Sequence, residues 1–160
     1  MQFDIRVGKP ADWPVYRDIR LRMLQEAPDA YGSSYAFEAG FAESVWRQRA
    51  GNPMLFLAMD RQAEVVGTST GMEGRDGTVD VVAMYVAPEA RGQGCAELLL
   101  DAVAATAREH GARRLVLLVT AGNRAASRCY TRYGFLPTGR AWPMERKPEL
   151  TEVELVLALD

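Results

Sequence analysis

Residues 78–119 constrain the fold more tightly than any other part of the chain. Residues 78–86 are rich in β-branched side chains and predict a strand. Apolar residues then recur every three or four positions over 94–110, which predicts an amphipathic helix. Residues 115–119 are apolar at every position, as is typical of a strand covered on both faces. A strand, a helix and a second buried strand in this order imply a parallel pair joined by a right-handed crossover.

Shorter patterns of the same kinds divide the rest of the chain. Alternating or apolar runs predict further strands over 3–7, 54–59, 64–72, 135–141 and 152–159. Helical spacing, capping residues and prolines predict further helices over 13–27, 42–50 and 123–132. Glycines, serines and prolines predict an irregular aromatic segment over 28–41 and a polar loop over 144–150. Arg17, Arg20 and Arg22 are expected to form a solvated face of the first helix.

The resulting order of elements is β-α-α-β-β-β-α-β-α-β-β. It predicts an α/β (α+β) fold with a mixed, mostly antiparallel sheet that has one parallel strand pair at its centre. We expect residues 1–160 to form a single domain, which at this length can bury a core without disulfides.

Composition narrows the class of protein. The formal net charge of −2 argues against nucleic-acid binding through a bulk positive field. No apolar run approaches the length of a membrane span, and the N-terminus lacks the pattern of a signal peptide, so we expect a cytoplasmic protein without a membrane contact. Cys95 and Cys129 lie outside any CxxC pattern and His110 is the single histidine, so reduced thiols and no metal site are expected.

A glycine-containing turn precedes the helix over 94–110. Gly92 and Gly94 carry no side chain that would keep a ligand from the unpaired amides at the helix start, and Arg91 adds a positive charge. This combination predicts an anion site, most simply for a phosphate. The dinucleotide fingerprint fails because Glu97 stands where its third glycine belongs, and no Gly-Lys-Ser/Thr of the nucleoside-triphosphate loop follows. An ordinary strand–turn–helix connection with a surface arginine would have the same local sequence.

A second short pattern follows the strand over 115–119. Residues 123–135 carry N-x-x-A-x-x-x-Y-x-x-x-G-F in full, with Asn123 placed to cap a helix and Gly134 placed to end it. This pattern resembles a signature of the GNAT superfamily of acetyl-CoA-dependent N-acetyltransferases.

The turn at Arg91, Gly94 and Ala96 resembles the other signature of that superfamily, Q/R-x-x-G-x-G/A. The two patterns stand in the order and at the separation that the superfamily requires, and its fold has the order of elements predicted above. The resemblance therefore covers most of the chain.

The resemblance implies that acetyl-CoA is the co-substrate, with the diphosphate of coenzyme A at the turn and its pantetheine arm along the strand over 78–86. It places the following residues at coenzyme A: Met84, Tyr85, Val86, Arg91, Gly92, Gln93, Gly94, Cys95, Ala96, Asn123, Ala126 and Tyr130. It also implies that backbone amides at the end of this strand stabilise the oxyanion of the reaction.

In the reaction that the resemblance implies, a primary amine attacks the acetyl thioester directly and coenzyme A leaves as a thiolate. Tyr130 would act as the general acid, because a phenol with an ordinary pKa of about 10 keeps its proton at neutral pH and can donate it to the thiolate. An ordinary core tyrosine would also suit this position. Glu73 and Asp80 are candidate bases, although carboxylates at hairpin ends more often face solvent. Cys95 is expected to pack as an apolar residue and is not proposed as a nucleophile.

The acceptor is expected to be an amine of a small molecule or a peptide, and the sequence does not identify it. Aromatic residues near the first helices and the last hairpin are candidates for its binding site, although each suits a core equally well. They are Tyr31, Phe37, Trp46 and Trp142. Because no base stands out, a non-catalytic acyl-CoA-binding sensor of the same fold remains the alternative. A homodimer is common in the superfamily, and nothing in the sequence decides for or against one.

Overall fold

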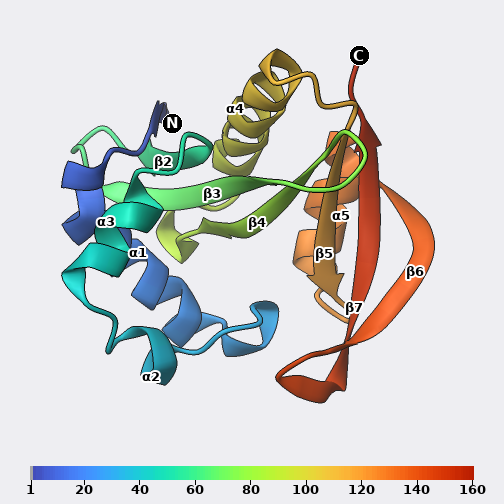
Figure 1. Ribbon diagram of the computed structural model, residues 1–160, viewed down its shortest axis with the longest axis horizontal. Coiled ribbons are helices and arrows are strands. Elements are labelled where there is room, and N and C mark those ends of the chain that lie inside the picture. The colour runs from blue at the N-terminus through green and yellow to red at the C-terminus, as the bar shows by residue number, and fades with distance from the viewer. Residues whose placement is uncertain (1) are drawn as a thin grey trace.

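The computed structural model describes residues 2–160 and has a seven-stranded sheet in the order β1-β2-β3-β4-β5-β7-β6 (Figure 1). The strands are β1 (Asp4–Val7), β2 (Leu55–Met59), β3 (Val65–Glu73), β4 (Thr78–Val86), β5 (Arg114–Thr120), β6 (Leu136–Met144) and β7 (Lys147–Ala158). The helices are α1 (Trp13–Glu26), α2 (Tyr35–Glu38), α3 (Glu43–Ala50), α4 (Cys95–Glu109) and α5 (Arg124–Tyr133), with 3-10 turns η1 (Pro10–Asp12), η2 (Pro28–Ala30) and η3 (Pro88–Ala90). Neighbouring strands are antiparallel except β4 and β5, which are parallel, so the predicted fold class is confirmed. Within this described range no helix is long and apolar enough to cross a lipid bilayer.

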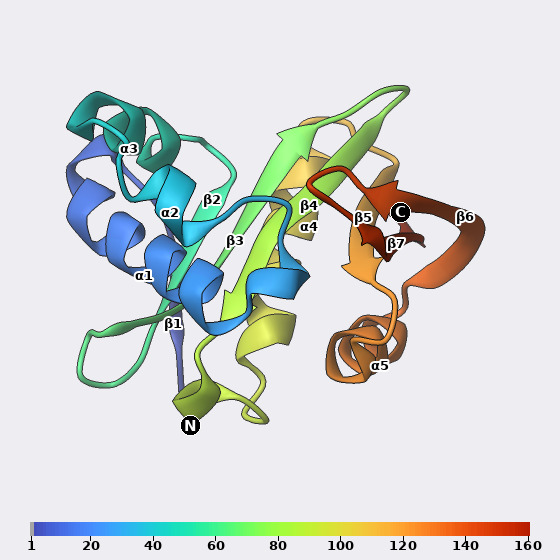
Figure 2. The same ribbon diagram turned by 90° about the horizontal axis from the view of Figure 1, so that it is seen from below.

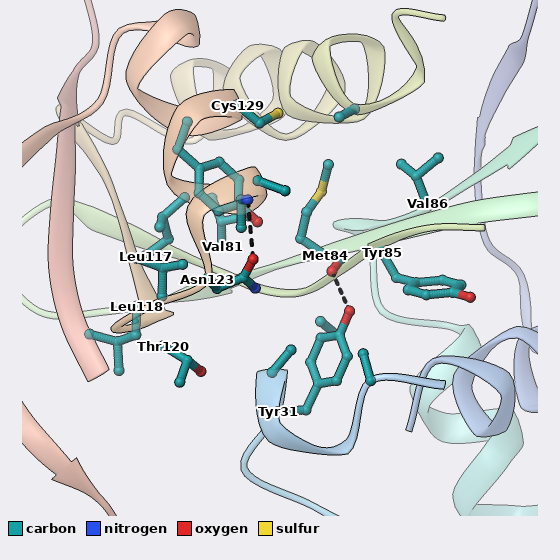
Figure 3. A pocket seen from close by; sticks show the side chains of 18 of the residues that line it. Tyr31, Val81, Met84, Tyr85, Val86, Leu117, Leu118, Thr120, Asn123 and Cys129 are labelled. Atoms are coloured by element: carbon teal, nitrogen blue, oxygen red, sulfur yellow. Dashed lines mark hydrogen bonds between the residues drawn. The ribbon is translucent and has the colours of Figure 1, made fainter. Parts of the chain in front are cut away.

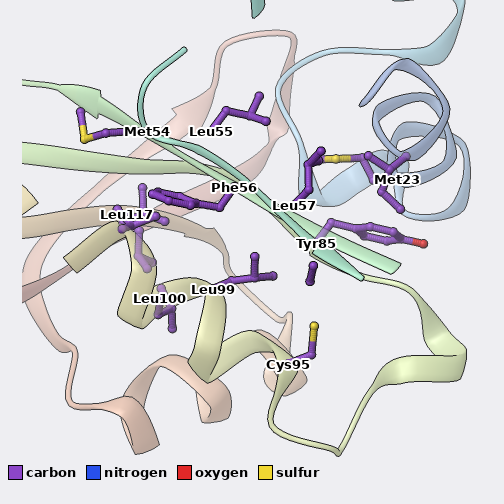
Figure 4. Packing of buried hydrophobic residues seen from close by; sticks show 14 of the residues in the cluster. Met23, Met54, Leu55, Phe56, Leu57, Tyr85, Cys95, Leu99, Leu100 and Leu117 are labelled. Atoms are coloured by element: carbon purple, nitrogen blue, oxygen red, sulfur yellow. The ribbon is translucent and has the colours of Figure 1, made fainter. Parts of the chain in front are cut away.

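Helix α4 packs across one face of the sheet and supplies much of the core. Its residues Leu99 and Leu100 are fully buried, and the helix contacts β2, β3 and β4. Leu117 of β5 is buried in the same core, and Figure 4 shows its side chain together with those of the two leucines. Helix α5 lies next to α4, where the Tyr133 hydroxyl donates a hydrogen bond to Asp101 (2.6 Å). Both helices therefore stand on one side of the sheet.

Helices α1 and α3 cover the opposite face only over the N-terminal half of the sheet (Figure 2). Met23 and Leu24 of α1 and Trp46 of α3 are buried beneath them. Strands β2 and β3 are thus buried on both faces, which fits their runs of apolar and small residues. Over β5, β6 and β7 this face carries no α-helix from the described chain, and side chains such as Leu118 and Trp142 stay exposed.

A buried ion cluster ties the connection between α1 and α3 to both helices. The Glu38 carboxylate is only 1% exposed and accepts hydrogen bonds from Nε and Nη2 of Arg20 (2.9 and 2.8 Å) and from Nη1 of Arg49 (2.9 Å). The expected solvated arginine face is therefore wrong for Arg20, because a carboxylate on the next helix supplies its counter-charge. Burial alone would raise the pKa of Glu38, but the hydrogen bonds from Arg20 outweigh burial and lower this pKa to about 2.

This cluster predicts a stabilisation that acid removes. Since the pKa of Glu38 falls from its ordinary 4.5 to about 2, the ionised carboxylate favours folding above about pH 4.5, and its contribution disappears as the pH falls toward 2. Chemical unfolding from neutral pH downward should show a smaller acid-dependent loss of unfolding free energy for Glu38→Gln than for the unaltered chain. Glu43→Gln, at an exposed ion pair with Arg47, is the matched control. Parallel pH profiles for the Glu38 variant and the unaltered chain would contradict this account.

The prediction of a polar loop over 144–150 is wrong, because β6 and β7 form a hairpin joined by a two-residue turn. Pro143 is tolerated in β6 because this edge strand has no further neighbour that needs the missing amide. Pro148 stands in β7 before the portion that pairs with β5, which begins at Glu152. The hairpin therefore extends beyond the rest of the sheet.

Candidate active site

A cavity of about 1300 Å³ opens between β4 and β5. The two parallel strands pair only where residues 78–80 face residues 114–116, and then diverge (Figure 2). Residues 80–86 and 116–120 line the opening, together with α5, the start of α4 and the segment after α1. Divergence leaves backbone donors and acceptors on the facing strand edges available to a ligand.

A β-bulge lies in the part of β4 that no longer pairs with β5. Thr68 pairs with Tyr85 but Thr70 pairs with Val82, so β4 holds one extra residue there. Ala83 within the bulge takes the left-handed conformation, with φ of 53°. Such a conformation costs a non-glycine residue about 1–3 kcal/mol and persists only where the surrounding structure imposes it.

Tyr31, in the segment that follows α1, makes a hydrogen bond to the bulge. Its hydroxyl donates a hydrogen bond to the Met84 carbonyl (2.8 Å), as Figure 3 shows. Burial raises the pKa of Tyr31, so this phenol stays a donor at neutral pH. The Thr120 hydroxyl donates to the Asp29 carbonyl (2.9 Å) and holds the same segment against β5. The segment after α1 thus forms one wall of the cavity.

The start of α4 presents open backbone donors to the cavity. Gly92 and Gly94 have φ of 74° and 88°, in the left-handed region that favours glycine. The first helical hydrogen bond runs from the Leu98 amide to the Gly94 carbonyl, so the amides of residues 95–97 have no partner within the helix. A Cβ added at Gly92 would meet nothing within 4 Å, so the space beside the turn is open. This geometry suits an anion at a positive helix end.

Arg91 is held in place by groups of the protein. Its Nε donates to the Val86 carbonyl (2.8 Å) and its Nη2 to the Glu26 carboxylate (2.7 Å), while the guanidinium lies 5.8 Å from the centroid of the Tyr85 ring. Arg91 therefore links the end of β4 to α1. Its charge is shared with Glu26, so the expected full positive charge beside the glycine turn is reduced.

Tyr130 of α5 lines the cavity and is 9% exposed. Its ring packs edge-on against Phe135, with ring centroids 5.9 Å apart. Asn123 caps the helix by accepting a hydrogen bond from the Ala126 amide (3.3 Å), as the sequence predicts. Burial raises the pKa of Tyr130 well above that of a free phenol, and within residues 2–160 its hydroxyl has no hydrogen-bond partner. This proton is therefore retained at neutral pH and available to a ligand.

Both cysteines line the cavity, and neither is activated. Burial, with the nearby Glu97 charge, raises the pKa of Cys95 to about 11 and also raises that of Cys129. A thiol with a raised pKa is a weak nucleophile. Cys95 is nearly fully buried and packs in the core, in line with the expectation.

Of the two candidate bases, Asp80 lines the cavity and Glu73 does not. Asp80 lines the cavity where β4 and β5 part, and burial, with the charge of Glu154, raises the pKa of its carboxyl. Glu73 pairs with Val79, next to Asp80 in the sheet, but it is exposed at the end of β3 and does not line the cavity. The structure therefore brings Asp80, and not Glu73, to the predicted coenzyme A residues.

Two of the four aromatic residues predicted for the acceptor site line the cavity, and the other two do not. Tyr31 and Trp142 line the cavity. Trp46 is 1% exposed and belongs to the core between α1 and α3, which corrects its assignment to the acceptor site. Phe37 lies outside the cavity, where the Arg146 guanidinium stands 4.7 Å from the centroid of its ring. Phe37 is 53% exposed, so its assignment to the acceptor site stays a prediction.

Most residues predicted to contact coenzyme A lie around the same cavity. Those lining it are Met84, Tyr85, Val86, Arg91, Gly92, Gly94, Cys95, Ala96, Asn123, Ala126 and Tyr130. Gln93 does not line it, because its side-chain amide donates to the Glu89 carbonyl (3.2 Å) at the outside of the turn. Nowhere in residues 2–160 do three His, Cys, Asp or Glu side chains gather as a metal site would need.

Two carboxylates of the cavity were missed by the sequence argument. Glu152 and Glu154 of β7 pair with Thr120 and Leu118 of β5 and line the opening. Their alternate spacing in a predicted strand indicates a shared face. Nothing local in the sequence shows that β7 inserts next to β5, so their place at the cavity depends on the sheet order.

A protein-family model for the acetyltransferase (GNAT) family matches residues 19–135, well over half of the chain. The chain belongs to the GNAT family. The match includes α4 and both signature segments, and it ends at Phe135 after α5, before the β6 and β7 residues that line the cavity.

Curated relatives of this GNAT chain align over part of their length. An uncharacterized N-acetyltransferase of Mycobacterium tuberculosis is 34% identical over 83 residues, which are 52% of this chain and 53% of the relative. The L-methionine sulfoximine/L-methionine sulfone acetyltransferase of Pseudomonas aeruginosa is 34% identical over 99 residues, 59% of this chain and 56% of the relative. The chain thus spans about half the length of the curated relatives it matches.

A solved structure matches over the whole chain. YncA of Salmonella typhimurium, determined with its cofactor acetyl-CoA, superposes with a TM-score of 0.77 at 22% identity, over 100% of this chain and 95% of that one. At this identity the match shows a shared fold.

Proposed function

We propose that this chain transfers the acetyl group of acetyl-CoA to a primary amine. The observation that carries the proposal is the cavity between β4 and β5, which joins the open amides at the start of α4 to the buried hydroxyl of Tyr130. Acyl transfer from a coenzyme A thioester needs an anion site for the carrier and a proton donor for the sulfur. Both lie on one continuous surface here.

The residues of the cavity fit coenzyme A. The amides of residues 95–97 and the open space at Gly92 suit a diphosphate. The edge of β4 beyond Asp80 has no partner on β5 and can pair with the pantetheine amides as an added strand would. Arg91, held by Glu26, lends partial positive charge at the rim. When bound, acetyl-CoA supplies an activated acetyl thioester.

The protonation states of two side chains suit direct transfer. Asp80, whose pKa is raised, accepts the proton that the amine loses, directly or through one water. As the N–C bond forms and the C–S bond breaks, Tyr130 donates its proton to the departing sulfur. Backbone amides at the bulge near Met84 offer donors to the carbonyl oxygen as its charge develops. Proton exchange with water restores both side chains.

We propose a small-molecule amine, in preference to a peptide, as the acceptor. The Pseudomonas aeruginosa relative is named for two small molecules, L-methionine sulfoximine and L-methionine sulfone. Beside the cavity, Lys147 donates to Asp29 (2.8 Å) and to the Pro28 carbonyl (3.1 Å), and Arg146 lies over Phe37. These contacts bridge the segment after α1 to the β6–β7 hairpin and leave less room for an extended peptide.

An acceptor screen tests this function. The chain is mixed with acetyl-CoA and a panel of primary amines, and free thiol and the mass of the acetylated product are measured. We expect thiol release to depend on both amine and protein, with one acetyl group added to the amine. Tight acetyl-CoA binding without product across the panel would favour a non-catalytic acyl-CoA sensor and contradict the proposal.

A further inference from the structure

The uncovered face of the sheet continues the cavity beyond β5. Strand register places Glu154 opposite Leu118 and Glu152 opposite Trp142, so these four side chains share one face. Leu118 is 47% and Trp142 42% exposed. All four line the same cavity as Tyr130. This part of the cavity combines apolar surface with carboxylates.

The charged side chains near α4 neutralise one another. Of the residues that line the cavity, Arg91 and Arg132 are the cationic ones. Arg91 pairs with Glu26 (2.7 Å) and Arg132 with Glu97 (3.7 Å). Each arginine that lines the cavity is therefore already paired with a carboxylate near α4, and neither is paired with a carboxylate of β7.

The carboxylates on the uncovered face have no such partners. Across the described residues no lysine, arginine or histidine stands within ion-pair distance of Asp80, Glu152 or Glu154. The recorded side-chain partner of Glu154 is the Thr138 hydroxyl, which donates to it (2.9 Å). The charge of Glu154 also raises the pKa of Asp80, so the fields of these carboxylates reach one another. Three carboxylates without an ion-pair partner thus line this end of the cavity.

A second observation marks this cavity as a site. The side chain of Tyr130 is nine-tenths buried and lines the cavity, and within residues 2–160 its hydroxyl donates to no protein group. The hydroxyl is therefore free to donate to a ligand in the cavity. The carboxylates without an ion-pair partner and the Tyr130 donor therefore line one cavity.

We infer that the acceptor of the proposed reaction is a small amine that carries a second cationic group, and this inference rests on the proposed function. Asp80 lies beside the reacting amine, and Glu152 and Glu154 bind the second cation. The apolar stem between the two nitrogens lies along Leu118, with Trp142 offering a ring face to the cation. A carboxylate on the acceptor would meet like charge on this face, so the inferred acceptor differs from the two amino acids for which the Pseudomonas aeruginosa relative is named.

Three acceptors of equal chain length test the inference: putrescine with two amines, butylamine with one, and γ-aminobutyrate with an amine and a carboxylate. We expect kcat/KM for putrescine to exceed that for butylamine by about tenfold or more, since a charge-assisted hydrogen bond contributes about 1.5–3 kcal/mol. γ-Aminobutyrate should be the poorest of the three. Calorimetry on the chain loaded with coenzyme A should give dissociation constants in the same order.

Variants of Glu152 and Glu154 test whether these carboxylates cause the preference for putrescine. In Glu152→Gln/Glu154→Gln the ratio of putrescine to butylamine should fall toward one, both in kcat/KM and in binding. Glu149→Gln removes one carboxylate from an exposed position of β7 outside the cavity and should keep the ratio. Equal preference for the three amines, or a ratio unchanged in the double variant, would overturn the inference. If no amine releases thiol but the calorimetric order and its loss in the variant hold, the charge inference stands and the proposed transfer fails.

Discussion

Replacing Tyr130 with phenylalanine is expected to slow acetyl transfer by about 10²- to 10⁴-fold, the usual contribution of a positioned general acid. The ring is buried against Phe135, so the variant keeps the packing and loses only the hydroxyl. The departing thiolate then loses its proton donor. Thiol release at saturating acetyl-CoA and amine measures the loss. The affinity for coenzyme A should stay within about fivefold, because a single neutral hydrogen bond contributes only about 1 kcal/mol.

Tyr133→Phe is the matched control for this experiment. Tyr133 lies on the same helix and also uses its hydroxyl, which donates to Asp101 (2.6 Å), but it does not line the cavity. Its loss should leave the rate of transfer near that of the unaltered chain. A Tyr130→Phe variant with unchanged rate would remove Tyr130 from the mechanism.

Gly94→Val is expected to abolish coenzyme A binding. The residue has φ of 88°, where an L side chain costs about 1–2 kcal/mol, and a branched side chain there would crowd the amides at the start of α4. At a coenzyme A concentration 100 times Kd, binding stabilises a protein by about 2.7 kcal/mol, which for this size raises Tm by about 5–10 °C. This rise in Tm should disappear in the variant.

A control variant at a second glycine distinguishes the effect of backbone strain from the loss of coenzyme A binding. Gly111 follows the other end of α4 with φ of 80°, and a Cβ there would meet nothing within 4 Å. Gly111→Val should lower the Tm of the free chain through similar strain but keep the rise with coenzyme A. If Gly94→Val shows the full rise as well, the start of α4 is not where the carrier binds.

Much of the fold was predictable because its determinants are local. The β-branched run over 78–86, the glycine turn and the helical spacing after it depend on neighbours a few residues away. Partners distant in the sequence were missed. Arg20 looks like a surface residue until Glu38 is placed against it, and the β6–β7 hairpin accommodates three prolines at the edge of the sheet. The bulge at Ala83 has no sequence signal, since alanine does not favour a positive φ.

In the candidate site, too, residues set by local spacing were predicted, and residues that depend on distant partners were missed. The residues of the glycine turn and those of α5 each keep fixed spacings within their own element, and the resemblance to the GNAT superfamily implied that both elements contact one ligand. Arg91 pairs with Glu26, which lies at the end of α1, 65 residues earlier in the sequence. No local pattern predicts a pair at that separation. Trp46 was misassigned because an aromatic residue near a site and one in a core have the same local sequence. Glu152 and Glu154 required the position of β7 beside β5.

A crystal structure grown with acetyl-CoA tests the central claim most directly. The account predicts the diphosphate against the amides of residues 95–97, the pantetheine arm between β4 and β5, and the sulfur within hydrogen-bond reach of the Tyr130 hydroxyl. Acetyl-CoA bound elsewhere on the chain, or no bound acetyl-CoA at a saturating concentration, would contradict it.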